Sequence, residues 1–239
     1  FGHDALPGYA DRAAYDVIAQ AASGLMSICG PEGGPPVRVG TSIGDIVAGH
    51  QCAIAILTAL WHRAQTGQGQ KIDQAMVDGL VYVLENALVR YTVAGETPQP
   101  LGTSHPAVAP FQAFRTGDGW IVIAAANESL WRRLCAALGS PALAADRRFA
   151  TNSLRMQNRA ALVVVLEELL SKKGTPAWLP ILEAAGVPAS AIQTVDQAAG
   201  DPNLLHRGMI ATIDQPRAGR MRIAGSPFRL SRTPSAVRA

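Results

Sequence analysis

The sequence has few aromatic residues, few charged residues and few cysteines, and each shortage narrows the class of protein. Aromatic side chains make up 5% and charged side chains 16% of the 239 residues, whereas 48% are hydrophobic. Disordered chains carry more charge and fewer apolar residues, so this composition predicts a buried core. The cysteines, Cys29, Cys52 and Cys135, lie far apart, which excludes a CxxC metal motif and argues against a disulfide framework. We therefore expect a reducing compartment, the cytoplasm.

Long hydrophobic runs and an export signal are also missing. The charge-free stretch that is richest in apolar residues, Ile46 to His62, contains a histidine and a glutamine. It is shorter than the ~20 apolar residues that a membrane span needs. The first residues, FGHDALPGYADR, show no basic segment followed by an apolar one. These absences predict a soluble protein that does not enter a membrane.

Lysine is scarce, and the positive charge comes from arginine. The chain has 21 basic and 18 acidic residues, a formal net charge of +3. Arginines without an acid gather between Gln215 and Ala239, but Phe228 is the one aromatic residue among them. Nucleic-acid binding needs stacking aromatics beside the charge, so a solvated basic segment is the favoured interpretation. The histidines show no HxxxH or HExxH spacing and have no cysteine cluster, so no metal site is expected.

Hydrophobic periodicity predicts a helical first part. Apolar residues recur at helical spacing over residues 11–27, 45–66 and 74–93, and Gly67 and Gly95 follow two of these stretches as helix stops. The middle stretch is apolar nearly all round, which predicts a buried helix. Residues 1–95 are therefore expected to form one helical portion of a domain.

The helical periodicity then ends at a Pro/Gly-rich connector, GETPQPLGTSHPAVAP. This change in composition marks a candidate domain boundary. After it, Gly117-Asp118-Gly119 predicts a β-hairpin and Asn127 predicts a helix N-cap. Further helices and strands alternate to the end of the chain. The expected organisation is a helical domain over residues 1–95, a linker over 96–106, a small α+β domain over 107–209 and a return segment over 210–239.

Asp45, in the segment IGDIVAGHQ, is the most informative single carboxylate. It stands at the predicted start of a helix, where unpaired N–H groups and the helix dipole stabilise the ionised form. Caps are common and nucleophilic carboxylates are rare, so the residue alone predicts a helix N-cap. Tyr15 is likewise interpreted first as a residue on the apolar face of the helix predicted over residues 11–27, and Asp16 as an acid near the start of that helix, where the helix dipole favours it. The residues taken singly indicate no more than a soluble α/β protein of enzyme-like composition.

Three segments taken together resemble one enzyme family. They are AAYDVIAQAASGLMSICG, VGTSIGDIVAGHQCAIAILTALWHRAQTGQGQKIDQAMVDGLV and HPAVAPFQAFRTGDGWIVIAAANESLWRRLCAALG. In this order they resemble the class III CoA-transferases, which include formyl-CoA and carnitine CoA-transferases and the α-methylacyl-CoA racemases. The G-D pair followed by A-I-L-x-A-L-x-x-R-x-x-T-G-x-G-Q carries most of the specificity. The likeness covers nearly the whole chain.

This resemblance implies a fold, substrates and a site. The fold would be α/β, with the helical part of a large Rossmann-like domain and a smaller α+β domain, and two chains would interlock as a homodimer. The catalytic residue would be Asp45. Tyr15, Asp16, Met76 and Gly44 would line the substrate or CoA site, although a core role for Met76 is equally favoured. The substrates would be an acyl-CoA and a carboxylic acid, with no metal, no bound cofactor and no nucleic acid.

The implied reaction suits a carboxylate nucleophile. Asp45 attacks the acyl-CoA carbonyl to form a mixed anhydride and release CoA thiolate. The thiolate returns to give an aspartyl-CoA thioester, from which the acceptor acid displaces Asp45. Racemisation or epimerisation is the rival activity, and it is disfavoured because Tyr15 stands where the racemases have a histidine base. An inactive chain that only binds CoA or a partner is the other alternative.

The chain departs from the family pattern at its ends. It opens just before the helix that carries Tyr15, without the nucleotide-binding segment that precedes it in relatives, and the last helix after the SxTP segment is not seen. Ala13 stands where some relatives have a lysine that contacts CoA. We therefore expect a fragment whose first three helices expose an apolar patch larger than the ~300–600 Å² usual for monomers.

Overall fold

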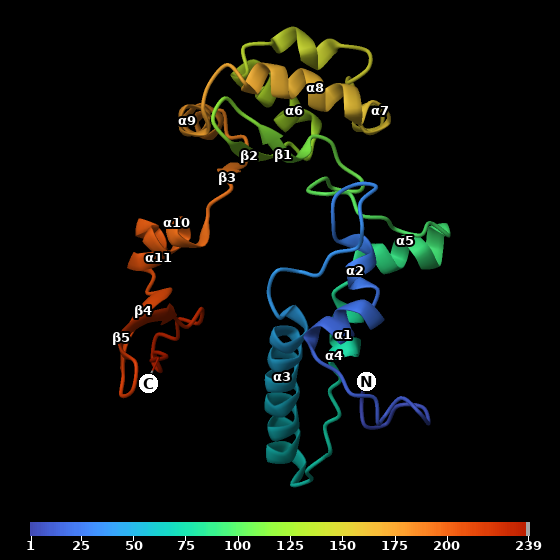
Figure 1. Cartoon of the computed structure of the whole chain (residues 1–239), viewed down its shortest axis with the longest axis vertical. Coiled ribbons are helices and arrows are strands. Elements are labelled where there is room, and N and C mark those ends of the chain that lie inside the picture. The colour runs from blue at the N-terminus through green and yellow to red at the C-terminus, as the bar shows by residue number, and fades with distance from the viewer. Residues whose placement is uncertain (238–239) are drawn as a thin grey trace. The chain divides into compact units, whose positions relative to one another are not determined.

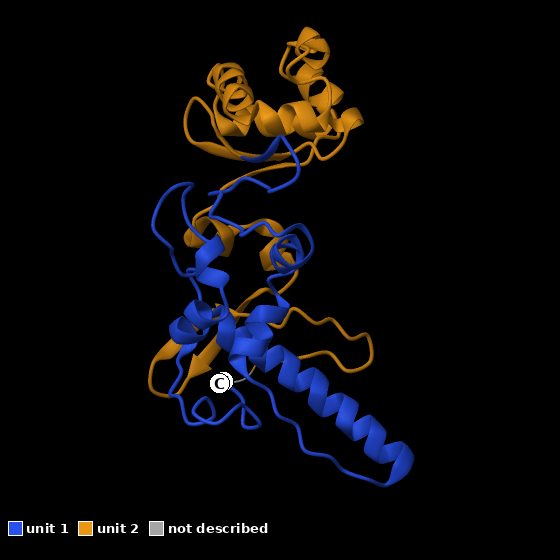
Figure 2. Cartoon of the chain, turned by 90° about the vertical axis from the view of Figure 1, so that its right-hand side faces the viewer, with its two compact units in different colours: residues 1–112 blue, residues 113–239 orange. Residues whose placement is uncertain are grey.

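A computed structural model describes residues 1–237 of the chain, which divide into two compact units (Figures 1 and 2). Unit 1 comprises residues 1–112 and unit 2 begins at Ala113. Residues 210–237 belong to the same unit as residues 113–209 of the expected small domain, whereas residues 107–112 belong to unit 1. Each unit is described by itself below.

Unit 1 is helical, as predicted, but two of its helices are interrupted. Its elements are α1 (Asp16–Ala22), α2 (Leu25–Ile28), α3 (Ile43–Thr66), α4 (Met76–Tyr82) and α5 (Asn86–Ala94). The helix predicted over residues 11–27 starts only at Asp16 and breaks at Gly24, whose φ is 86°. The helix predicted over 74–93 breaks before Asn86, where Glu85 has a φ of 51°. A positive φ cannot continue a right-handed helix, so apolar periodicity overstated both lengths.

The start of α3 is capped by another helix. Ser42 is the N-cap residue and Asp45 is the third residue of the helix, so the N-cap prediction for Asp45 is wrong. The Ser42 side chain makes no cap hydrogen bond. Instead, the Gly44 N–H donates to Oδ1 of Asp16 in α1 over 2.8 Å. A tertiary acceptor therefore takes the role that local sequence rules assign to the N-cap side chain.

The buried centre of unit 1 joins α1, α2 and α4. Ala19, Leu25 and Leu80 form this core cluster. Partly buried hydrophobic residues pack around it, namely Ile28, Cys29, Val39, Ile43, Met76, Val77 and Leu84. The cluster holds the beginning of α3 through Ile43, whereas most of α3 lies beyond it.

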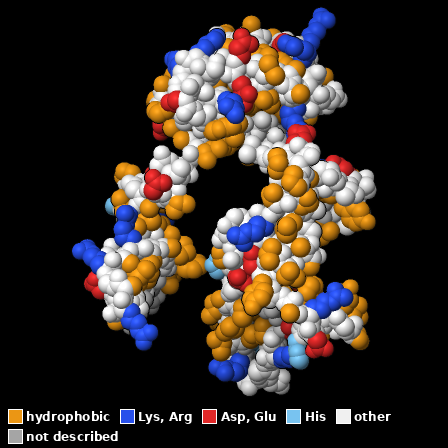
Figure 3. Space-filling view, viewed as in Figure 1, with side chains coloured by type: hydrophobic (Ala, Val, Ile, Leu, Met, Phe, Trp, Pro, Cys, Tyr) orange, Lys and Arg blue, Asp and Glu red, His pale blue; other side chains and the backbone are white. Residues whose placement is uncertain are grey.

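The burial predicted for α3 is wrong. Gly44 is the one buried residue of this helix. Ile54, Leu57 and Trp61 are 64%, 67% and 70% exposed, and hydrophobic side chains are spread widely over the surface of unit 1 in Figure 3. The composition indicates a helix that needs cover on most sides, but within residues 1–237 only α1 and α4 pack substantially against it. These exposed residues lie where an apolar patch larger than the ~300–600 Å² usual for monomers was expected, and the area of that patch stays a prediction.

α3 also has the length and composition of a membrane span. It has 24 residues and a mean hydropathy of 1.5 in its most apolar window, the one such helix in residues 1–237. The charge-free stretch in the sequence ends at His62, before Arg63, and is therefore shorter than the helix. Core helices of soluble proteins share these properties, so length and hydropathy alone assign no environment to α3.

Unit 2 combines a small sheet with packed helices. Its elements are β1 (Phe111–Arg115, which begins at the end of unit 1), β2 (Trp120–Ala124), α6 (Glu128–Ala137), the 3₁₀ helix η1 (Pro141–Ala145), α7 (Asn152–Gln157), α8 (Arg159–Leu170), α9 (Thr175–Ala184), β3 (Ala189–Ala191), α10 (Val195–Gly200), α11 (Pro202–His206), β4 (Ile210–Gln215) and β5 (Gly219–Ala224). The strands of the first sheet lie in the order β1-β2-β3, and β4 pairs with β5 separately. In the antiparallel β2–β3 pair, Ile121 faces Ala191.

Two local predictions in unit 2 are confirmed. The chain turns between β1 and β2, where the Thr116 N–H donates to the Gly119 carbonyl over 3.0 Å. The Asn127 side chain accepts a hydrogen bond from the Leu130 N–H and caps α6. Both features depend on short-range turn and cap chemistry, which a sequence shows directly.

A buried arginine ties the helices of unit 2 together. Arg155 has 0% exposure, and its guanidinium donates to both carboxylate oxygens of Glu128 over 2.9 and 3.0 Å. It also donates to the Phe149 carbonyl over 3.0 Å and lies 5.1 Å from the ring centre of Trp131. The hydrogen bonds from Arg155 hold the pKa of Glu128 below its usual value. No sequence pattern marked this residue as part of a core.

Replacing Arg155 by methionine is expected to lower the free energy of unfolding by about 3 kcal/mol, because it leaves the Phe149 carbonyl and the Glu128 carboxylate without their buried partner. Guanidinium denaturation measures this change. The pKa of Glu128 is lowered on folding, so its contribution is present above the unfolded pKa and disappears as the pH falls through the folded one. The variant should lose that acid dependence.

The exposed Arg147 on a neighbouring turn offers a matched control. Arg147→Met should change the free energy of unfolding by less than about 0.5 kcal/mol. Equal stability of the Arg155 and Arg147 variants would contradict the structural role of Arg155.

Candidate active site

The starts of α1 and α3 meet through one buried carboxylate. Asp16 is 7% exposed and binds the Gly44 N–H, although 28 residues separate the two in the sequence. A Cβ on residue 44 would lie 3.1 Å from Oδ1 of Asp16 and 3.2 Å from Cδ1 of Leu80. The glycine of the G-D pair is therefore needed for close packing, and it brings the next residue, Asp45, beside the start of α1.

Gln20, which the sequence analysis did not single out, completes this arrangement. Its side chain has 0% exposure, and its Nε2 donates to Oδ2 of Asp16 over 2.8 Å. Its Oε1 accepts from the Val39 N–H over 2.9 Å. One amide thus fixes both the Asp16 carboxylate and the loop that leads into α3. A glutamine inside a helix carries no local signal of such a role.

Asp45 itself is exposed in the first turn of α3. No hydrogen bond or ion pair between residues 1 and 237 holds its carboxylate. The N-terminal end of a long helix favours an anion through its dipole and its unpaired N–H groups. The position therefore presents a carboxylate that is anchored through its backbone and open to a reaction partner.

The other predicted site residues lie at the starts of α1 and α4 and differ in how far they are exposed. Tyr15 is the N-cap residue of α1 and is 83% exposed. Met76 is the first residue of α4 and packs against the core cluster of unit 1. Both oxygens of Asp16 are engaged by protein groups, which favours a positioning role over direct substrate contact. The substrate contacts expected of Tyr15, Met76 and Gly44 stay predictions.

One cation, Arg38, approaches the buried Asp16 carboxylate. Nη1 of Arg38 lies 3.9 Å from Oδ2 of Asp16, and the arginine side chain is 51% exposed. This distance is longer than a hydrogen bond, and Asp16 already has two closer partners. The guanidinium therefore keeps most of its donors available to solvent or to a ligand.

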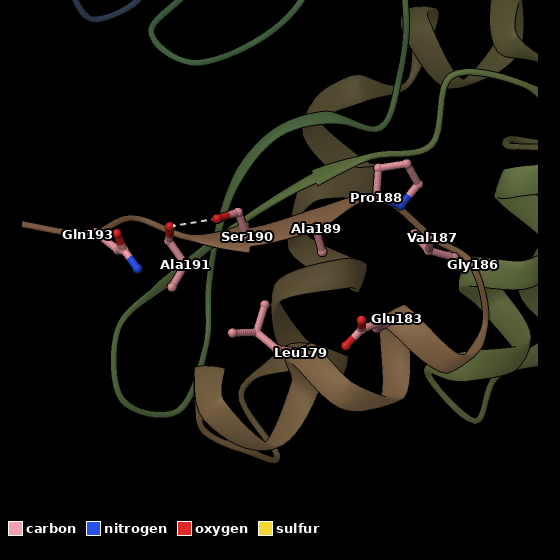
Figure 4. A pocket seen from close by; sticks show the side chains of 9 residues that line it. All are labelled: Leu179, Glu183, Gly186, Val187, Pro188, Ala189, Ser190, Ala191 and Gln193. Atoms are coloured by element: carbon pink, nitrogen blue, oxygen red, sulfur yellow. Dashed lines mark hydrogen bonds between the residues drawn. The ribbon is translucent and has the colours of Figure 1, made fainter. Parts of the chain in front are cut away.

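A hollow lies in unit 2, between α9 and β3. It has a volume of about 560 Å³, and Figure 4 shows Leu179 and Glu183 on the helix side and Ser190 on the strand side. The Ser190 hydroxyl donates to the Ala191 carbonyl over 3.1 Å. Glu183 is the one acid that lines this hollow. This hollow has no nucleophile paired with a base, so the first turn of α3 is the stronger catalytic candidate.

Thiols and metal ligands offer no competing site among the described residues. All three cysteines are free, and burial raises the pKa of Cys135 to about 12, which makes it a poor nucleophile at neutral pH. Within residues 1–237, no group of three or more His, Cys, Asp or Glu side chains is placed to hold a metal ion.

Comparison with known proteins places the chain in a family. The model of CoA-transferase family III matches residues 1–239. The chain belongs to this family, as the resemblance had indicated. It is 38% identical over 220 residues to succinyl-CoA:mesaconate CoA-transferase of Haloarcula marismortui, covering 92% of this chain and 55% of that one. It is 34% identical over 221 residues to human succinyl-CoA:glutarate CoA-transferase, covering 92% and 50%. It is 39% identical over 219 residues to acetyl-CoA:oxalate CoA-transferase of Acetobacter aceti, covering 91% and 55%.

Solved structures agree with this assignment. A CAIB/BAIF family protein from Brucella suis superposes with a TM-score of 0.81 at 38% identity, covering 98% of this chain and 60% of that one. Rv3272 from Mycobacterium tuberculosis superposes with a TM-score of 0.86 at 27% identity, covering 99% and 62%. The α/β class III fold is therefore confirmed. The chain spans about half the length of the curated relatives it matches.

Proposed function

We propose that the complete protein is a CoA-transferase that moves CoA from an acyl-CoA thioester to a carboxylic acid, with Asp45 as the acylated residue. The observation that carries this proposal is the placement of Asp45, an exposed carboxylate directly after the glycine that Asp16 anchors. Family membership supplies the reaction class. A carboxylate needs no metal or redox group to exchange one acyl bond for another.

The proposed reaction has four acyl exchanges. An oxygen of Asp45 attacks the thioester carbonyl, the C–S bond breaks, and CoA leaves as a thiolate from an Asp45 acyl anhydride. The thiolate then attacks the Asp45 carbonyl carbon and expels the donor acid as a carboxylate. The acceptor carboxylate next attacks the aspartyl thioester, which expels CoA thiolate and leaves an anhydride between Asp45 and the acceptor. Finally, the thiolate attacks the acceptor carbonyl of this anhydride, which forms the new CoA thioester and regenerates the Asp45 carboxylate. N–H groups at the start of α3 are candidates to stabilise the developing oxyanions.

We further propose a dicarboxylic acid as the acceptor. The relatives described above are named for mesaconate, glutarate and oxalate, each of which has two carboxylate groups. One carboxylate of such an acid reacts, and the other must be accommodated as a fixed negative charge. A site for this class therefore needs a cation beside the reactive carboxylate.

The assembly proposed for the complete protein is a homodimer in the cytoplasm. The exposed apolar residues of α3 support association, because surfaces of this kind mark contacts with other protein surfaces or membranes. Free cysteines fit a reducing compartment. In an assembled protein, additional chain is needed to exclude water from Asp45, which is exposed in unit 1.

Acyl exchange by the complete protein tests the proposal. Acetyl-CoA or succinyl-CoA is incubated with mesaconate, glutarate or oxalate, and mass spectrometry follows the new CoA thioester. We expect one or more of these acids to be thioesterified without net hydrolysis. Incorporation of solvent deuterium at the α-carbon of an acyl-CoA, without any exchange of CoA, would instead establish a racemase or epimerase.

A further inference from the structure

Arg38 is the one cation in residues 1–237 recorded in contact with the carboxylate that anchors the start of α3. Its guanidinium approaches Asp16 through a single nitrogen at 3.9 Å, and the side chain is half exposed. Within residues 1–237 the Arg38 guanidinium donates no hydrogen bond. A guanidinium in this state retains the paired N–H groups that bind a carboxylate through two parallel hydrogen bonds.

The backbone beside Arg38 is held in place. The next residue, Val39, donates its N–H to the buried amide of Gln20, and the same amide binds Asp16. Asp16 in turn binds the Gly44 N–H, one residue before Asp45. The arginine and the proposed nucleophile are therefore fixed to one buried group. Such preorganisation lowers the entropy cost of recognising a charged ligand.

Other cations of unit 1 are engaged or distant. Arg12 donates to the Gly8 carbonyl over 3.0 Å. Lys71 pairs with Asp4 over 3.1 Å, and Arg90 pairs with Glu96. Arg63 lies in the last turn of α3. At about 1.5 Å per residue, that turn is roughly 27 Å along the helix from Asp45. Arg38 is thus the arginine whose position relative to the start of α3 is set by direct contacts.

Electrostatics explains why a dicarboxylic acceptor needs this residue. When the acceptor binds, Asp45 is an uncharged thioester, but the Asp16 carboxylate lies beside the start of α3. An acceptor with two carboxylates therefore approaches Asp16 against repulsion. A guanidinium beside Asp16 offsets that repulsion and gives the unreactive end of the acid a defined partner. A monocarboxylic acceptor has no such end and gains nothing from the contact.

We propose that Arg38 is a specificity-determining residue that binds the second, unreactive carboxylate of the acceptor acid. This inference rests on the proposed function of the complete protein. It assigns Arg38 to the acceptor rather than to the phosphates of CoA, and so predicts which Michaelis constant changes when the charge is removed.

The test compares a dicarboxylic acceptor with a monocarboxylic acceptor of equal length in the complete enzyme. Acetyl-CoA is the donor, and glutarate and pentanoate are the acceptors. In Arg38→Gln, the KM for glutarate should rise about 10- to 100-fold, the loss expected for a charge-assisted hydrogen bond. The KM for acetyl-CoA and the kcat/KM for pentanoate should stay within about twofold. Arg38→Lys should recover part of the glutarate affinity because it keeps the charge.

Arg63→Gln, at the far end of α3, is the matched control and should leave every constant unchanged. An unchanged glutarate KM in Arg38→Gln would overturn the inference, as would equal losses with both acceptors. A rise in the acetyl-CoA KM alone would assign Arg38 to CoA and also overturn it. If the wild-type enzyme exchanges CoA but does not prefer glutarate, mesaconate or oxalate to pentanoate, this inference fails while CoA transfer stands. Absence of any exchange would refute the proposed function itself.

Discussion

Replacing Asp45 with alanine is expected to reduce CoA exchange by the complete protein by about 10⁴-fold or more, because no other residue would form the covalent acyl intermediate. Asp45 makes no structural hydrogen bond within residues 1–237, so folding should be unaffected. The free energy of unfolding should therefore change by less than about 0.5 kcal/mol. Asp45→Asn should be equally inactive, since an amide is a poor nucleophile.

Chemical trapping identifies the acylated residue directly. Hydroxylamine added to the wild-type protein with acyl-CoA should convert Asp45 to its hydroxamate, which peptide mass spectrometry locates. Asp78, an exposed acid in the first turn of α4, provides the control variant. Asp78→Ala should retain exchange. Wild-type exchange by the Asp45→Ala protein, or trapping at another carboxylate, would refute the assignment.

Replacing Asp16 with alanine is expected to impair both stability and exchange. The change removes the acceptor of the Gly44 N–H and leaves the buried amide of Gln20 without its carboxylate partner. Leaving such groups unpaired should cost about 2–4 kcal/mol of the free energy of unfolding. Exchange should fall together with this stability because the first turn of α3 loses its anchor. Urea denaturation and kcat measure the two effects on the same preparation.

The contrast between two acids makes this prediction specific. Asp11 is exposed, and Asp11→Ala should match the wild type in both measurements. Asp16→Asn keeps one oxygen for the Gly44 N–H and should recover part of the stability. If Asp16→Ala unfolds like the wild type yet shows a raised KM for substrate, then Asp16 contacts substrate rather than positioning the helix.

The parts of the fold that the sequence predicted depend on short-range chemistry. Gly67 and Gly95 end their helices in the left-handed conformation, as expected from their positions. The turn before Gly119 and the Asn127 cap were also predictable, because their partners lie within three residues. The G-D pair was recognisable only as a pattern, since a local interpretation of Asp45 gave a helix cap.

The parts that the sequence did not predict depend on partners distant in the chain. The acceptor for the start of α3 comes from Asp16, and no local rule selects a residue in a separate helix. Gln20 and Arg155 are long polar side chains that became fully buried because each found several partners. The apolar pattern of α3 predicted burial for the opposite reason, since hydrophobicity indicates a need for burial without showing what supplies it; exposure was expected only from the family resemblance.

The cap that Asp16 provides for α3 also has a consequence for the order of folding. Bringing Asp16 to Gly44 closes a loop of 28 residues, and the entropy of that closure must be offset before the contact is stable. We therefore expect the first turn of α3 to form late, after α1 has docked, whereas the rest of the helix can form from local contacts. A nascent or partly unfolded chain would carry Asp45 on a frayed, unanchored end. The reactive geometry thus arises only with tertiary structure, and it vanishes when α1 detaches.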